Sequence, residues 1–77
     1  MNVSSIRRKR FENVASRRVQ KILEQLDTLA NCSNKANYEY TDDDVKKIFS
    51  AIKEKIKSTE IIFDIQTSRS EKNKFKL

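Results

Sequence analysis

Glycine, proline, histidine and tryptophan are all absent from the 77 residues of this chain, and cysteine occurs once. A single cysteine cannot form an internal disulfide, and the absence of histidine removes the commonest metal ligand and general base. Cys32 has no histidine to activate its thiol, and no base is placed to use a serine or threonine. We therefore expect no enzymatic activity, no cofactor and no small-molecule substrate.

Long hydrophobic runs are also missing. No segment approaches the roughly 18 apolar residues of a membrane span, and no apolar run of signal-peptide length follows the basic opening MNVSSIRRKRF. We expect a cytoplasmic protein with no membrane partner. Hydrophobic residues make up 36% of the chain, so one copy can bury only a small core. Because neither a disulfide nor a metal is expected to stabilise that core, oligomerisation is the remaining candidate.

A helical stripe of apolar residues occupies the first half of the chain. The spacing alternates between three and four residues, close to a heptad seam, at Phe11, Ala15, Val19, Ile22, Leu26 and Leu29. This pattern predicts a helix over about 5–31. Arg8 falls inside the stripe if the helix is extended backwards, so we expect the packed part to begin near Phe11, preceded by a basic N-terminal extension.

The second half repeats the stripe and predicts a helix over about 41–63, with Val45, Ile48, Phe49, Ile52, Ile56 and Phe63 on one face. Thr41 can act as the N-cap, and Asp44 stands at the third helical position, where the acid of a capping box is found. Asp42 and Asp43 add negative charge at the positive end of the helix dipole. Capping explains these three adjacent acids better than a metal site, because they lack the alternate spacing of a calcium loop.

The connection between the helices, NCSNKANYEYTDDD, has to turn without glycine or proline. Asn31, Asn34 and Asn37 can adopt the left-handed or Asx-turn conformations that glycine usually supplies. We predict an all-α, antiparallel two-helix hairpin domain over residues 1–64 and a disordered polar tail over residues 65–77.

Two helices alone leave their flanking apolar residues uncovered, which favours a homodimer that forms a four-helix bundle. A long open hairpin docked on a larger partner is the alternative. The expected oligomer interface consists of Val19, Ile22, Leu23, Leu26, Phe49, Ile52 and Ile56. The sequence leaves open whether two chains would run parallel or antiparallel.

Charge is segregated along the chain, with a net of +6 overall. Residues 1–21 hold seven cations and one acid, residues 22–45 hold one cation and six acids, and residues 46–77 hold nine cations and four acids. In an antiparallel hairpin the two basic blocks would converge at one end, and the acidic turn would lie at the other. This polarity says more about partners than the net charge does.

The basic blocks favour contact with a nucleic-acid backbone. Four consecutive cations, residues 7–10, lie near the positive end of a helix dipole, and an external anion would relieve that conflict. The candidate contact residues are Arg7, Arg8, Lys9, Arg10, Arg17, Lys21, Lys46, Lys53 and Lys57. The alternative is a lysine-rich surface that keeps a small protein soluble. The sequence contains no helix-turn-helix, zinc-finger or glycine-bearing RNA-binding signature, and it does not distinguish DNA from RNA.

Segments of residues 9–63 resemble a group of short uncharacterised proteins from mobile genetic elements and prophages of low-GC Gram-positive bacteria. The segments are KRFENVA, RVQKILEQLDTL, NCSNKANYEYTDDDV and KKIFSAI. The resemblance spans about two thirds of the chain and implies context, with no functional residue carried over. Such a context implies a small accessory or regulatory protein. The alternative is a protein-binding adaptor or an inhibitor of a host protein, such as a defence nuclease, with no direct nucleic-acid contact.

Overall fold

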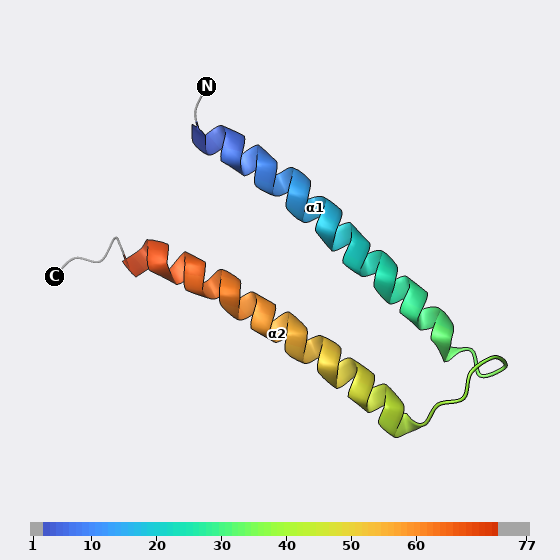
Figure 1. The fold of residues 1–77 in the computed structure, drawn as a ribbon. Coiled ribbons are helices and arrows are strands. Elements are labelled where there is room, and N and C mark those ends of the chain that lie inside the picture. Colours follow the sequence, from blue (N-terminus) through green and yellow to red (C-terminus); the bar gives the residue numbers. More distant parts are fainter. Residues whose placement is uncertain (1–2, 73–77) are drawn as a thin grey trace. The chain divides into compact units, whose positions relative to one another are not determined.

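The computed structural model describes residues 3–72, and the side chains of residues 5–68. The described chain is all-α and contains no strand (Figure 1). Its elements are a helix α1 at Val3–Ala30, a short 3₁₀ turn η1 at Asn31–Ser33 and a helix α2 at Asp42–Lys72. The prediction of an all-α chain with two long helices joined by a turn is confirmed. The chain divides into two units, residues 1–39 and 40–77, each built on one helix, so the antiparallel packing of the helices stays a prediction.

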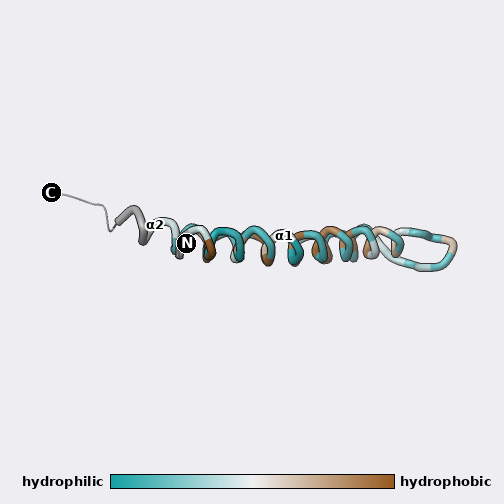
Figure 2. Tube along the Cα trace, turned by 90° about the horizontal axis from the view of Figure 1, so that it is seen from above, coloured by the Kyte–Doolittle hydropathy of each residue, from teal (hydrophilic) through white to brown (hydrophobic). Residues whose placement is uncertain are grey.

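Helix α1 begins at Val3, slightly before the predicted start, and has 28 residues. Its sequence is rich in Arg, Lys, Glu, Gln and Leu, which favour helix, and nothing in it breaks the hydrogen-bond ladder. The basic residues before Phe11 therefore continue the same helix as the apolar stripe. Figure 2 shows hydrophobic positions recurring among hydrophilic ones along α1.

The turn after α1 is organised by Asn34. Its side-chain Oδ1 accepts a hydrogen bond from the Ala36 N–H at 2.9 Å, and its carbonyl oxygen accepts from the N–H groups of Asn37 and Tyr38 at 3.1 and 3.0 Å. Asn34 itself is extended, with φ −70° and ψ 103°. No described residue has a positive φ. Of the two conformations predicted for these asparagines, the Asx turn is thus the one found, and it is found at Asn34.

The predicted capping box at the start of α2 is confirmed. Asp44 N–H donates to Thr41 Oγ1 at 3.2 Å, and Thr41 N–H donates to Asp44 Oδ2 at 2.9 Å. The first helical backbone bond runs from Val45 N–H to the Thr41 carbonyl oxygen at 3.2 Å. Because all three bonds lie within one turn, the residues that form them were readable from sequence spacing alone.

The end of α2 corrects the predicted boundary. The helix continues to Lys72, whereas the sequence predicted an end at about residue 63 and a disordered tail over 65–77. Residues 65–72 are helical because no glycine or proline stops the hydrogen-bond ladder. The Thr67 hydroxyl is satisfied within the helix, since it donates to the Phe63 carbonyl oxygen at 2.9 Å. Residues 73–77 of the predicted tail lie outside the described residues.

No side chain of residues 5–68 is fully buried. The half-buried ones fall on or beside the predicted stripes, at Val14, Ala15, Leu26, Leu29, Tyr40, Val45 and Ile52. Neither helix, over its described residues, is long and apolar enough to cross a membrane.

Candidate nucleic-acid interface

The structure places all nine predicted contact residues on helices, with their side chains exposed. Helix α1 carries Arg7, Arg8, Lys9, Arg10, Arg17 and Lys21, and α2 carries Lys46, Lys53 and Lys57. The two groups belong to different units of the chain. Their convergence at one end of a hairpin stays a prediction, and each group is considered on its own helix.

On α1, a row of three cations follows the helix axis. Successive residues are rotated by about 100° and raised by 1.5 Å, so Arg10, Arg17 and Lys21 share an arc of about 40° and span about 16 Å. The Arg17 Nε donates to the Asn13 carbonyl oxygen at 3.3 Å, which leaves the other guanidinium N–H groups available. Cations at these spacings can contact successive phosphates along one side of a strand.

Arg8 differs from its neighbours because the chain itself supplies an anion. Its Nε donates to Glu12 Oε1 at 2.8 Å, and its guanidinium carbon lies 5.8 Å from the centroid of the Phe11 ring. The Arg8 and Glu12 side chains are 69% and 54% exposed, so this pair adds little stability. Glu12 offsets one of the four consecutive cations at residues 7–10, a compensation that the sequence analysis had assigned entirely to an external anion.

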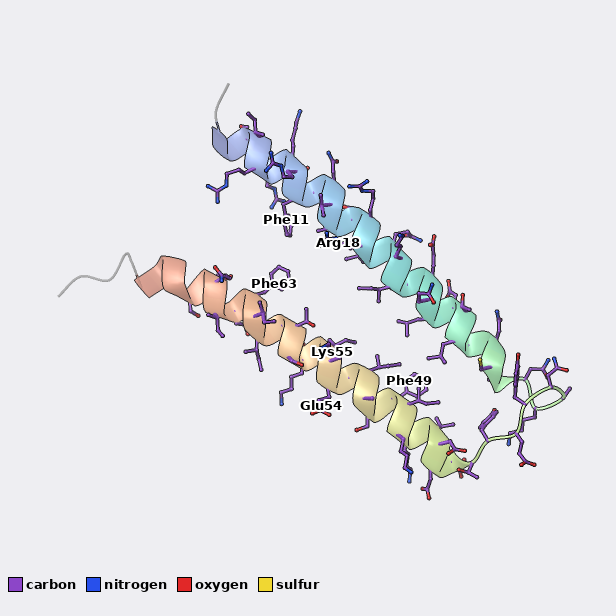
Figure 3. The ribbon with its side chains drawn as sticks, viewed as in Figure 1. Phe11, Arg18, Phe49, Glu54, Lys55 and Phe63 are labelled. Carbon is purple, nitrogen blue, oxygen red and sulfur yellow. The ribbon has the colours of Figure 1, made fainter. Side chains whose placement is uncertain are left out.

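Arg18 is a cation that the sequence analysis left out of the candidate contacts. It follows Phe11 by seven residues, so the two side chains leave α1 in directions about 20° apart. Figure 3 shows both projecting from the same side of α1. Arg7, four residues before Phe11, lies within about 40° of the same direction. The sequence signal that could have identified Arg18 is its spacing of two turns from Phe11, together with the one-turn spacing between Arg7 and Phe11.

The lysine row on α2 has the same spacing as the row on α1 but a weaker local charge. Lys46, Lys53 and Lys57 also share an arc of about 40°. Asp42 stands one turn before this row, and Asp64 falls on its arc two turns after Lys57. These acids reduce the positive potential, so α1 presents the stronger phosphate-binding surface.

The predicted oligomer interface is exposed on both helices. On α1, Val19, Ile22 and Leu23 are 51%, 58% and 50% exposed, and Leu26 is half-buried. The α2 members are Phe49, at 45% exposed, Ile56, at 50% exposed, and the half-buried Ile52. Dimerisation through these residues stays a prediction.

Other chemistry is sparse. Cys32 is an exposed free thiol. Among the residues described, no three His, Cys, Asp or Glu side chains are grouped in a way that could hold a metal ion.

No protein-family model matches this chain, and neither a curated protein nor a solved structure shows significant similarity to it. Function therefore has to be argued from the chain's own helices and charges.

Proposed function

We propose that this protein is a small, non-enzymatic accessory or regulatory protein that contacts a nucleic-acid backbone through the basic start of α1. The observation that carries the proposal is one continuous helix, Val3–Ala30, in which residues 7–21 hold seven cations and a single acid. That acid, Glu12, is paired with Arg8. The remaining cations have exposed side chains and face water in several directions.

Phosphate contact gives this arrangement a physical role. Like charges at neighbouring positions on one helix repel each other, and a polyanion offsets that repulsion while releasing its own counterions. Binding of this kind is sequence-tolerant, because phosphate oxygens carry no base information. The context we propose is a mobile genetic element or phage, in a cytoplasmic setting, with the resemblance noted above as support.

A homodimer is part of the proposal. Among residues 5–68, thirteen large hydrophobic side chains are at least 40% exposed, and the stripes on both helices are spaced for coiled-coil packing. A second copy would cover the predicted interface residues, which do not include Phe11. It would also bring two basic α1 segments into one assembly, which would increase affinity through two linked contacts.

One observation favours a second candidate, a protein-binding adaptor or inhibitor. Ile61 and Ile65 are 47% and 46% exposed and lie one turn apart on α2, on the side opposite the Val45–Phe63 stripe. Ile62, at 62% exposed, extends this second apolar face. Such a face would suit a protein surface, with the basic residues then serving solubility or an acidic partner.

The experiment that separates the candidates is fluorescence anisotropy of labelled DNA and RNA, repeated between roughly 50 and 200 mM salt. Each phosphate contact adds roughly 0.7 to 0.9 to the slope of log affinity on log salt. The triple variant Arg7, Arg8 and Arg10→Ala should lower that slope by roughly 2 to 3 units.

The matched control is Lys35, Lys47 and Lys55→Ala, which removes the same charge at positions outside the candidate contacts. It should keep most of the slope. Equal losses in the two variants would show that net charge, rather than the start of α1, drives binding. If the wild-type protein does not bind nucleic acid at low salt, the result would favour the second candidate, a protein-binding adaptor or inhibitor.

A further inference from the structure

The basic start of α1 also contains an exposed aromatic ring. Phe11 is 50% exposed, with Arg7 and Arg8 one turn before it and Arg18 two turns after it. The three arginines lie within about 60° of the direction in which Phe11 leaves the helix. An apolar ring thus has phosphate-binding groups one turn before it and two turns after it.

One of these arginines is already oriented against the ring. The guanidinium carbon of Arg8 is 5.8 Å from the Phe11 centroid, and Glu12 holds its Nε at 2.8 Å. Nε uses one of the five N–H donors of the guanidinium, so the other four remain able to reach a phosphate or a base edge. Ring and cation therefore form a partly pre-oriented pair, which lowers the entropic cost of binding a ligand that uses both.

A ligand that offers phosphates and flat faces together fits this pair. In a duplex the base faces are covered by stacking, so an exposed ring on a helix has no base to contact without opening the strands. In a single strand the faces are free, and aromatic stacking combined with a cationic track is the usual mode of sequence-tolerant binding.

We propose that single-stranded nucleic acid is the preferred ligand of α1, with one base stacked on Phe11 and the flanking phosphates held by Arg7, Arg8 and Arg18. This inference rests on the proposed function and names its substrate class. Phe11 is the first residue of the apolar stripe, one turn after Arg7 and Arg8 and two turns before Arg18. Its position thus differs from that of Leu26, whose neighbours one turn before and one turn after, Ile22, Leu23, Leu29 and Ala30, are all apolar.

The test compares a labelled single strand with a hairpin duplex of equal nucleotide number, for wild type and Phe11→Leu. Leucine keeps an apolar side chain but has no aromatic face. Single-strand affinity should fall about tenfold, within the range measured for loss of one base–aromatic stack. Duplex affinity and the salt slope should stay at wild-type values, because the phosphate contacts are untouched.

The chain offers a matched control in Phe63, which is 57% exposed and has no cation within one turn on either side. Phe63→Leu should leave single-strand affinity unchanged. Phe11→Tyr keeps the ring and should retain wild-type single-strand affinity. If Phe11→Leu changes the helix content or the mass of the protein, Phe11→Tyr becomes the test of stacking. A loss of single-strand affinity in Phe11→Tyr would overturn the stacking role of Phe11.

Two further outcomes separate this inference from the proposed function. Equal affinity for single strand and duplex, with the arginine triple variant still defective, would refute single-strand preference and leave backbone contact standing. No binding to either form at low salt would refute both. Wild-type single-strand affinity in Phe11→Leu would refute the stacking contact alone.

Discussion

The capping box of α2 allows a quantitative prediction. Replacing Thr41 by Ala removes the oxygen that accepts the Asp44 N–H at 3.2 Å and leaves that N–H without its side-chain acceptor. Loss of a threonine N-cap costs about 1 kcal/mol, within a range of roughly 0.5 to 2, so the folding equilibrium constant should fall about fivefold. Urea unfolding followed by far-UV circular dichroism measures this change in the free energy of unfolding.

Asp43 provides the control that separates charge from hydrogen bonding. Asp43→Ala removes a negative charge from the first turn, worth about 0.3 to 1 kcal/mol through the helix dipole. Asp44→Ala removes a similar charge and also the acceptor of the Thr41 N–H at 2.9 Å, a bond worth about 1 kcal/mol net. Asp44→Ala should therefore be the more destabilising of the two. Equal losses, or a Thr41→Ala variant as stable as wild type, would refute the capping argument.

Three further predictions concern the ion pair, the dimer and the end of α2. Glu12→Gln should raise nucleic-acid affinity about threefold, which is the size of one charge–charge interaction across roughly 6 Å of water, and anisotropy measures this change. The free energy of unfolding, measured with urea, should change by less than about 0.5 kcal/mol. Weaker binding by this variant would show that Glu12 orients Arg8 for binding. Leu26→Asp should abolish the dimer in sedimentation equilibrium, because it places a charge in the predicted interface. Asn13→Asp, about 140° away on α1, should leave the dimer intact. A mass of 9.1 kDa for the wild-type protein would refute dimerisation. Residues 65–68 should show helical Cα chemical shifts, and random-coil values there would contradict the extended α2.

The placement of the predicted cations at exposed helix positions was predictable because exposure on a helix follows from periodicity. All nine predicted cations lie on α1 or α2 with exposed side chains. The missed residue, Arg18, leaves α1 about 100° away from Arg17 and so lies outside the row that Arg17 forms with Arg10 and Lys21. Its significance comes from its position two turns after Phe11 on nearly the same side of α1.

The sequence did not predict which cations already contact other side chains of the protein, because such contacts depend on rotamers as well as spacing. Glu12 stands four residues after Arg8 but also three after Lys9, and the sequence does not decide between them. In the structure Arg8 takes the carboxylate and lies against the Phe11 ring. Lys9 makes no ion pair among the residues described.

The sequence by itself determined the two amphipathic helices and the start of α2, since a stripe repeats every turn and a capping box acts within four residues. The structure decided the continuation of α2 beyond residue 63 and the Asx turn at Asn34. Both depend on competition between backbone conformations with similar local free energies. In a chain without glycine or proline, no residue marks the outcome of that competition in advance.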